Sequence, residues 1–400
     1  MKLKKILFIA FIISALYSCK SEMYITNVNS NYLKNSSGVT YSLPKTKLII
    51  EIEVTETHKQ RGPFSKYTNL YFNTKNAIIK DNVDYRISNI SIHTTPVIDS
   101  SNIYCINNSD NKIASLINLS PNGFIAGINL SDYQSEKLET EQKNISITND
   151  NNNKFIDYAN FSLKSIREIQ YDTIYKEVLQ DSVIVKVPII KKKEVFKSLQ
   201  KQAKETADIL FLLRDDRNAL LKGENDGDNF PDGEALKLMI NELNKLEKQY
   251  MSLFTGQELK IKKQYKFEII PKASSFNDTI YLFSFSSKTG LYNNKSSYNK
   301  NSIFLKLVQN DNLKATSNYT KKNIANNKNK IGGYNGIIYR IPQNIVTEII
   351  NSNKSLYKKE LKIAQSGTLN IIPTNLLKET KVEFYPQYGS LKRISKLKEE

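Results

Sequence analysis

Acidic residues between positions 224 and 234 form the densest group of side chains in this sequence that could do acid–base or metal chemistry. The group consists of Glu224, Asp226, Asp228, Asp232 and Glu234. Paired carboxylates can act as general acid and base, and carboxylate oxygens are ligands that Ca²⁺ prefers. The acidic group could therefore support a carboxylate-dependent reaction or a calcium site, and its spacing decides between these and a structural role.

The spacing of this acidic group does not follow the EF-hand pattern, which needs a bidentate Glu at position twelve of the loop. Counted from Asp226, position twelve is Lys237. Counted from Asp228, it is Met239. The spacing favours helix capping and a solvated loop, and a weak metal or acid cluster remains the alternative.

Histidine and cysteine are too few for the familiar metal and nucleophile motifs. The chain has two histidines, His58 and His93, and two cysteines, Cys19 and Cys105. No His-x-x-x-His, Cys-x-x-Cys, Gly-x-Ser-x-Gly or Walker spacing occurs. Alternation places Cys105 on the same strand face as Ile103, which predicts a buried structural thiol. The sequence therefore predicts no catalytic residue, no metal site of familiar type and no cofactor.

Cys19 ends a segment that has the features of an export signal. Lysines near the start precede an apolar run over residues 6–16, which is shorter than the ~20 residues that a membrane span needs. Leu16-Tyr17-Ser18-Cys19 resembles a bacterial lipobox, which implies cleavage before Cys19 and acyl chains on that residue. Those chains would tether the protein to a membrane. The alternative is an ordinary secretory signal followed by a free cysteine.

Three Asp-Ser/Thr-aliphatic triplets offer possible modification sites. They are Asp172-Thr173-Ile174, Asp181-Ser182-Val183 and Asp278-Thr279-Ile280. The triplets resemble the acceptor motif for O-glycosylation in Bacteroidota, which implies glycans on Thr173, Ser182 and Thr279. The alternative is that each triplet is strand sequence.

The formal net charge of +18 comes from lysines that are scattered over the whole chain. Nucleic-acid binding requires a clustered basic face, and an exported protein meets little nucleic acid. We therefore expect no nucleic-acid partner. The 23 tyrosines and 17 phenylalanines could line a cleft for sugars or peptides, but alternating strand positions favour core packing.

Alternating apolar and polar residues predict short strands over most of the chain. The clearest strand is Leu48–Val54, with Ile50, Ile52 and Val54 on one face. The Tyr85–His93 strand turns Ile90 and Ile92 inward and His93 outward. Further expected strands are Ile113–Leu119, Phe124–Leu130, Ile166–Ile174, Val183–Ile190, Tyr265–Ile270, Thr279–Phe285, Ile303–Val308, Gly336–Ile341, Leu361–Ile363, Leu369–Ile372 and Val382–Tyr385. Residues 310–330 read as a polar loop in which 313–319 could form a short strand.

Two helices interrupt the strands and form a predicted antiparallel hairpin. Apolar residues at helical spacing predict the first over Val195–Lys222 and the second over Asp232–Phe254. Asp232 is the expected N-cap, and Gly256 the expected glycine after the last turn. Arg217 interrupts the first apolar stripe and would pair with Asp215 or with an acidic residue of the second helix. We expect the second helix to brace two sheets from inside.

Several segments resemble one known family. They are Tyr41-Ser-Leu-Pro-Lys-Thr, Gly62-Pro-Phe-Ser-Lys-Tyr, Pro231-Asp-Gly-Glu-Ala-Leu, Ser252-Leu-Phe-Thr-Gly, Tyr339-Arg-Ile-Pro and Phe384-Tyr-Pro-Gln-Tyr-Gly-Ser-Leu. Together they look like domain-of-unknown-function family 4831, whose members are uncharacterised exported proteins of Bacteroidota. The resemblance covers residues 41–391. The family has no established activity, so it assigns no functional residue.

These observations predict an α+β, mainly β chain with two antiparallel β-sandwich-like domains flanking the helical hairpin. The expected divisions are a signal peptide (1–18), a lipidated tether (19–40), an N-terminal β domain (41–193), the hairpin (194–256), a C-terminal β domain (257–392) and a tail (393–400).

The leading functional hypothesis is a non-enzymatic lipoprotein of the cell envelope, anchored in the outer membrane through Cys19, that binds a protein or glycan. Whether it faces the periplasm or the cell surface stays open. The alternative is a carboxylate-dependent hydrolase that acts on an envelope polymer. Two carboxylates ~5–10 Å apart in a cleft would favour the hydrolase. An exposed aromatic or apolar patch would favour binding.

Overall fold

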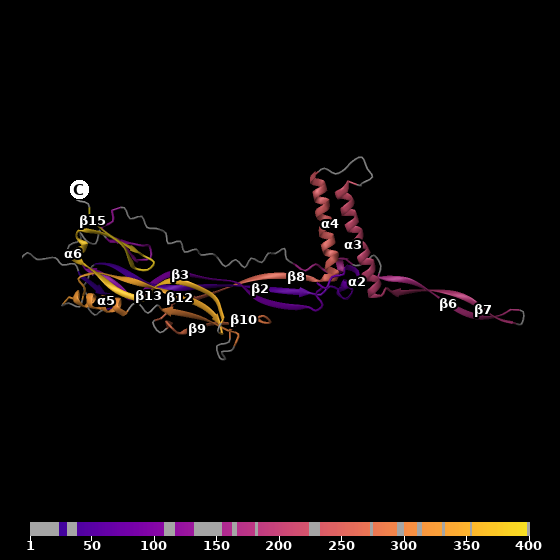
Figure 1. Cartoon of the computed structure of the whole chain (residues 1–400), viewed down its shortest axis with the longest axis horizontal. Helices are drawn as coiled ribbons and strands as arrows, with labels where there is room; N and C mark the ends of the chain where they lie inside the picture. The colour runs from indigo at the N-terminus through magenta and orange to yellow at the C-terminus, as the bar shows by residue number, and fades with distance from the viewer. Residues whose placement is uncertain are drawn as a thin grey trace, which may run out of the picture.

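The computed structural model shows an elongated molecule (Figure 1). A body of β-sheets lies at one end, a pair of helices stands away from the long axis, and a two-stranded ribbon extends at the other end. The structure describes residues 24–29, 38–107, 117–131, 154–161, 166–180, 183–223, 233–272, 275–293, 300–309, 314–329, 333–352 and 354–397. The chain is mainly β, with 57% strand and 24% helix, and one sheet curls into a half-barrel. The predicted α+β, mainly β class is therefore confirmed.

The first sheet has the strand order β1-β3-β2-β8, and all its pairs are antiparallel. The strands are β1 (Tyr24–Asn27), β2 (Gly38–Gln60), β3 (Asn82–Asn107) and β8 (Gln257–Ile269). β2 extends well beyond the predicted Leu48–Val54. Before that run Val39, Tyr41 and Leu43 alternate with polar residues, and after it the polar residues 55–60 pair with β8. Ile50 and Ile52 are fully buried, as the alternation predicts.

The second sheet has the order β10-β9-β11-β12-β15-β14-β5-β4, and β13 also pairs with β12. The strands are β4 (Ile117–Leu119), β5 (Ile125–Ile128), β9 (Thr279–Ser286), β10 (Gly290–Tyr292), β11 (Ser302–Gln309), β12 (Gly336–Asn351), β13 (Lys354–Pro373), β14 (Thr380–Tyr385) and β15 (Ser390–Lys396). The pairing of β12 with β15 is parallel, and the others are antiparallel. The third sheet is the ribbon of β6 (Arg167–Gln180) and β7 (Val183–Phe196).

Both large sheets contain strands from the two segments that the sequence suggests as separate β domains. β8, from the C-terminal segment, pairs with β2, from the N-terminal segment. β5, from the N-terminal segment, pairs with β14, where Ile128 lies opposite Val382. Each strand carries its own alternation but nothing that names a distant neighbour, so the sequence could not predict this mixing.

One apolar core lies where the two large sheets meet near the middle of β2. Leu48, Ile50 and Ile52 of β2 pack in one buried cluster with Ile345 and Ile349 of β12. Each of these five side chains is fully buried. The inward face of β2 is therefore covered by the second sheet.

A second core lies near the N-terminal end of β2. Tyr41 is 1% exposed, and its ring stacks on Tyr104 with centroids 5.5 Å apart. The Tyr41 hydroxyl accepts a hydrogen bond from the Ile338 N–H and donates one to the Ile338 carbonyl, both at 3.1 Å. This side chain therefore links β2 to β12 across the core.

Two long helices follow the ribbon: α3 (Leu199–Lys222) and α4 (Gly233–Thr255). α3 begins four residues later than predicted, because β7 continues to Phe196 and Ser198 caps the helix by accepting from the Lys201 N–H at 3.2 Å. Gly256 ends α4 with a φ of 85°, which confirms the predicted terminal glycine. The predicted cap Asp232 lies outside the described residues.

α3 and α4 lie side by side and stand away from the sheets (Figure 1). Glu247 of α4 pairs with Arg214 at 2.7 Å and also with Arg217, so the acidic partner of Arg217 comes from the second helix. The expectation that α4 braces two sheets from inside is wrong. Leu238 is 65% exposed, and the buried residues of α4 are Ser252, Leu253 and Phe254, in its last turns. The apolar stripe faces α3, since periodicity identifies an apolar side but not what covers it.

The last turn of α4 is held by an aromatic cluster at the base of the helices. Short helices η2 (Ser65–Tyr67) and α2 (Thr68–Phe72) supply the other side of this cluster. The Phe254 ring is fully buried, with Phe64 at 5.4 Å and Phe72 at 4.8 Å between centroids. Thr68 donates a hydrogen bond to the Phe254 carbonyl at 2.8 Å. A side chain on Gly62 would meet the Leu253 carbonyl oxygen at 2.3 Å, so the close approach there requires glycine.

Three local features differ from the sequence prediction. α5 (Lys314–Asn326) replaces the expected polar loop and short strand, because β13 covers one side of it and Thr320 is 1% exposed there. β1, β10 and β15 are not predicted, and the first two have only four and three residues. Pro342 lies inside β12 at a register shift, where a missing N–H is tolerated. The remaining short helices are η4 (Tyr158–Phe161) and α6 (Thr374–Leu377).

Replacing Phe254 tests whether the aromatic cluster holds the helices to the body. Phe254→Ala should lower the free energy of unfolding by ~3–5 kcal/mol, because it leaves a cavity among the rings of Phe64, Tyr71 and Phe72. Leu238→Ala, on the exposed side of the same helix, should change it by less than ~0.5 kcal/mol. Denaturant titration of both variants provides the measurement, and equal values for the two would contradict the assignment.

Candidate functional site

The β6–β7 ribbon presents the largest collection of exposed apolar side chains in the part of the chain that the structure describes. It projects from the base of α3 (Figure 1), and among the described strands neither β6 nor β7 has a second neighbour. The exposed apolar side chains are Ile169, Tyr171, Ile174, Tyr175, Val178 and Leu179 of β6, and Val183, Ile184, Val185, Val187, Ile189, Ile190 and Phe196 of β7. A lone two-stranded ribbon is marginally stable in water, so such a surface favours a covering partner.

Apolar residues occupy both faces of the outer half of the ribbon. Residues directly opposite one another in an antiparallel pair share a face. One face carries the pairs Ile174–Ile189 and Val178–Val185, and the other carries Tyr175–Pro188 and Leu179–Ile184. Apolar residues on both faces are typical of strands that are buried on both sides of a larger sheet.

The base of the ribbon is polar and is fixed to α3. Glu168 pairs with Lys201 in the first turn of α3. The Arg167 guanidinium lies 4.9 Å from the centroid of the Phe196 ring across the ribbon. The Lys197 N–H donates to the Ile166 carbonyl at 2.8 Å. These contacts fix the direction in which the ribbon leaves the helices.

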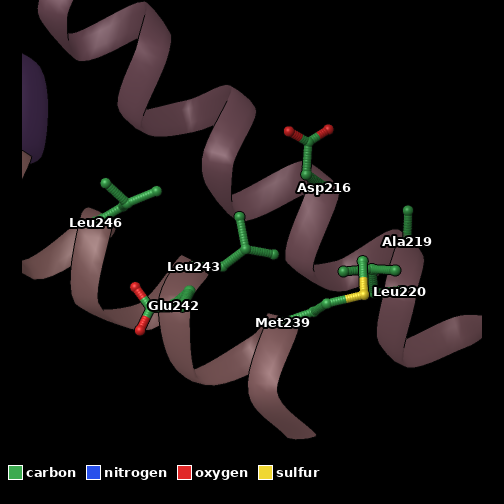
Figure 2. A pocket seen from close by; sticks show the side chains of 7 residues that line it. All are labelled: Asp216, Ala219, Leu220, Met239, Glu242, Leu243 and Leu246. Atoms are coloured by element: carbon green, nitrogen blue, oxygen red, sulfur yellow. The ribbon is translucent and has the colours of Figure 1, made fainter. Parts of the chain in front are cut away.

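A pocket of about 460 Å³ lies between α3 and α4, near their outer ends (Figure 2). Asp216, Ala219 and Leu220 of α3 and Met239, Glu242, Leu243 and Leu246 of α4 line it. In Figure 2, Leu243 points toward α3 and Met239 toward Leu220. The pocket lies within the ~300–1,000 Å³ range of small-molecule sites, and its lining suits an apolar chain.

The two carboxylates of this pocket do not form an acid–base pair. The carboxyl groups of Asp216 and Glu242 point away from each other in Figure 2. Glu242 instead pairs with Lys245 of its own helix at 3.3 Å. General acid–base chemistry needs two groups that converge on one reacting bond. The pocket therefore offers binding space rather than a reaction centre.

A second group of titratable side chains surrounds Glu56 on the first sheet. Glu56 is 7% exposed. Its Oε1 lies 2.8 Å from His58 Nε2 and 3.2 Å from the Tyr85 hydroxyl, and its Oε2 lies 2.5 Å from Lys263 Nζ. Burial raises the pKa of Glu56, but Lys263, Tyr85 and His58 outweigh it, and the net pKa is lowered. A proton donor at neutral pH needs a raised pKa, so this group stabilises β2 against β8.

A third charged group centres on Asp99 of β3 and Arg340 of β12. Asp99 and Arg340 are 2% and 5% exposed and pair with each other, and the partly exposed Lys45 places its Nζ 2.8 Å from Asp99 Oδ1. Burial raises the pKa of Asp99, but hydrogen bonds from Lys45 and Asn102 and the charge of Arg340 lower it below its usual value. Burial also lowers the pKa of Arg340. The buried Asp99–Arg340 pair joins the two sheets.

The acidic group at residues 224–234 is mostly outside the described residues. Glu224, Asp226, Asp228 and Asp232 are not described. Glu234 is exposed in the first turn of α4, where the helix dipole favours an acid. Within the described residues, no group of three or more His, Cys, Asp or Glu side chains is placed to hold a metal ion.

The predicted modification sites are either exposed or outside the described residues. Cys19 and Ser182 lie outside the described residues. Thr173 on β6 and Thr279 at the start of β9 are exposed, so both hydroxyls are accessible. Cys105 is 2% exposed, which confirms the predicted buried thiol.

The sequence contains a signal for the Glu56 group and one for the apolar ribbon, although it predicts neither as a site. Glu56 has the same parity as Ile50, Ile52 and Val54, so the alternation already places a carboxylate on the buried face. The outer half of the ribbon has apolar residues at both parities, which is unusual for a strand with one face in water. Neither signal specifies the surroundings of the residue.

Residues 37–165 and 191–392 match a domain of unknown function, DUF4831. The chain belongs to this family. No curated protein and no solved structure matches the chain. The match omits residues 166–190, which hold all of β6 and the first eight residues of β7. Most of the ribbon therefore lies outside the part of the chain that matches DUF4831. None of the helices in the described residues combines the length and apolar content of a membrane span.

Removing Lys263 tests the role of the Glu56 group. Because the folded pKa of Glu56 is lowered, its contribution to stability is present above the unfolded pKa and is lost as the pH falls through the folded pKa. Lys263→Met should cost ~1–3 kcal/mol at pH 7 and much less at an acidic pH below the folded pKa of Glu56, where its carboxyl group is protonated. Lys260→Met, at an exposed pair with Glu258, should cost less than ~1 kcal/mol at either pH. Equal losses at both pH values would contradict this role.

Intact-mass measurement of the protein purified from its own organism tests modification. Glycans on Thr173 and Thr279 should each add the mass of one oligosaccharide, and Thr173→Ala should remove one increment. Thr347→Ala, at a buried hydroxyl on β12, should leave the added mass unchanged. An unmodified mass for the wild-type chain would disprove glycosylation.

Proposed function

We propose that this member of the DUF4831 family is a lipid-anchored protein of the cell envelope that binds another protein through its β6–β7 ribbon. The observation that carries the proposal is the position of the exposed apolar residues. They lie on an element that projects from the body and falls mostly outside the residues that match the family. Hydrophobic side chains in such a position gain free energy when a partner covers them.

The anchor in this proposal is Cys19, and the outer membrane is the proposed site. The sequence around Cys19 supports it through the lysine-rich start, the short apolar run and the Leu-x-Ser-Cys order. Within the expected tether of residues 19–40, Tyr24–Asn27 form β1, so the segment that follows the lipid and precedes β1 would act as the tether. The body would then hold the ribbon away from the membrane attachment point.

A protein partner fits this surface better than a glycan. The ribbon exposes Ile, Val and Leu side chains together with open strand edges, which proteins recognise by packing and strand addition. Sugar sites need several convergent polar groups beside an aromatic face. The α3–α4 pocket is lined mainly by Ala, Leu and Met, so it too favours an apolar partner segment.

A hydrolase would require two carboxylates that converge on one cleft. Asp216 and Glu242 line the same pocket but point apart (Figure 2). The two buried carboxyl groups whose pKa is lowered pair with basic side chains: Glu56 with Lys263, and Asp99 with Lys45 and Arg340. The binding hypothesis therefore accounts for more of the described residues than the hydrolase alternative does.

We further propose a sandwich-like body and an antiparallel α3–α4 hairpin as the scaffold for this role. Support for the body comes from one buried cluster that takes Ile50 from the first sheet and Ile349 from the second. Support for the hairpin comes from the pairing of Glu247 with two arginines of α3. In this arrangement the scaffold positions the ribbon and the pocket on the same side of the body.

Affinity purification of the acylated protein from its own membrane tests the proposal. A stoichiometric protein should co-purify with the wild-type chain and should be lost from the double variant Tyr175→Ser, Leu179→Ser. The matched control is Leu212→Ser, Leu238→Ser, which removes side chains of similar exposure from α3 and α4 and should retain the partner. Recovery of a partner, whether a different protein or an untagged second copy of the chain, that is the same in all three samples or absent from all would disprove docking through the ribbon.

A further inference from the structure

We infer that the occupant of the ribbon is a second copy of this chain, and that two β6 strands pair edge to edge and antiparallel about a two-fold axis at Ile174. The inference rests on the proposed binding role of the ribbon and names its partner. The product is a four-stranded antiparallel ribbon in the order β7-β6-β6-β7. A sheet needs three or more strands to be stable on its own, which a lone hairpin lacks and this four-stranded ribbon has.

The two edges of the ribbon differ in their capacity to accept another strand. β6 and β7 pair over their full lengths without a register shift, and Pro188 lies in the middle of β7 opposite Tyr175. Proline has no N–H and is tolerated within such a ladder where its nitrogen faces the outer edge. The β7 edge therefore lacks a donor at its centre. Lys186 and the run Lys191–Lys193 add charges that further disfavour strand addition there.

The β6 edge has neither of these obstacles. Its fourteen residues contain no proline, and its one lysine is Lys176. The side chains at its centre are β-branched or aromatic, with Tyr171 67% and Tyr175 65% exposed. Such residues favour strand pairing. β6 is therefore the edge that an added strand would join.

The charges of β6 are complementary to themselves in the antiparallel register centred on Ile174. There, Asp172 of each copy lies opposite Lys176 of the other, so the opposite-charge pair forms twice and no like charges of β6 meet. Centring on Lys176 would place two lysines opposite each other. Centring on Asp172 would place two aspartates opposite each other, and the opposite-charge pairs that it offers would use Glu168 and Arg167, which already pair with Lys201 and Glu194 at the base of each ribbon. Charge therefore favours the register centred on Ile174.

The apolar residues fit the same register. Ile169 of each copy lies opposite Leu179 of the other, and the two Ile174 side chains lie opposite each other on the two-fold axis. Apolar and aromatic cross-strand pairs of this kind stabilise a sheet. The two bodies would lie at opposite ends of the shared ribbon, separated by roughly 40 Å at 3.4 Å per residue. The pairing therefore requires no contact between the bodies.

Most of the ribbon also lies outside the residues that match the family model. A partner for this surface must carry a matching surface. A second copy meets this condition by construction, since a two-fold interface uses the same patch twice. A lipid bilayer is a poorer occupant, because the unpaired edge groups of a two-stranded ribbon would be costly in lipid.

Cross-linking through single cysteines tests the register. In the full-length protein, Ile174→Cys places two thiols opposite each other across the axis, and mild oxidation should give a disulfide-linked dimer. Ile189→Cys is the matched control, because Ile189 lies beside Ile174 on the same face and is equally exposed at 39%. Its two copies would be three strands apart, roughly 14 Å, which is too far for a disulfide. Cross-linking of both variants, or of neither, would overturn the inference.

Charge reversal tests the partner pairing without a covalent bond. Sedimentation velocity of the detergent-solubilised protein should show a dimer that Asp172→Lys weakens about 2- to 30-fold, because two cross-strand pairs are lost. Lys176→Asp should weaken it similarly. The double variant Asp172→Lys, Lys176→Asp should restore dimerisation, and failure of this rescue would disprove the register.

The outcomes separate this inference from the proposed function. If a different protein co-purifies in a ribbon-dependent way and Ile174→Cys gives no dimer, the binding role stands and the second copy is wrong. If Ile174→Cys dimerises selectively and the charge reversal rescues, the second copy is the partner. If neither ribbon-dependent recovery nor selective cross-linking occurs, both conclusions fall.

Discussion

β2 is paired on both sides over more than half its length, and the body depends on this double pairing. From Leu48 to Gln60 it lies between β3 and β8, and its inward aliphatic residues face β12 across the central core. Toward its start, Tyr41 bonds the backbone of Ile338. One strand thus takes part in both cores and holds the two halves of the chain in shared sheets. Loss of β2 pairing would expose the apolar faces of both large sheets at once, which is why the body has no natural dividing line.

The helices and the ribbon depend on a much smaller area. Only the last turn of α4 enters the aromatic cluster, where Phe254 packs among rings from η2 and α2. The outer parts of α3 and α4 are stabilised mainly by each other, through Glu247 and its two arginines and through the leucines of the pocket. The ribbon has even less cover. Stability therefore decreases from the body outward, and the elements with least internal support are the ones that present apolar surface for a partner.

The charged groups also differ between the body and the ribbon. In the body, the Asp99–Arg340 pair is buried and the buried Glu56 carboxylate is matched by the exposed Lys263, and the net lowering of both carboxyl pKa values reflects partners that outweigh burial. Removing one member of such a pair is costly because the other stays buried and charged. On β6, by contrast, Asp172 and Lys176 are exposed on an open edge. The same Coulombic attraction that closes the body can therefore act between molecules at the ribbon.

The sequence alone determined the β-rich class, the buried face of β2, the buried Cys105, the approximate extent of both long helices and the family. These follow from local periodicity, capping residues and short motifs, all of which act between near neighbours in the chain. Tertiary structure alone decided that β8 joins β2, that the α3–α4 pair stands away from the sheets, and that a polar segment forms α5 against β13. Among the described strands, it also left β6 and β7 with no neighbour but each other. Alternation records that a residue is apolar, but what covers it is set by strands and helices that lie far away in the sequence.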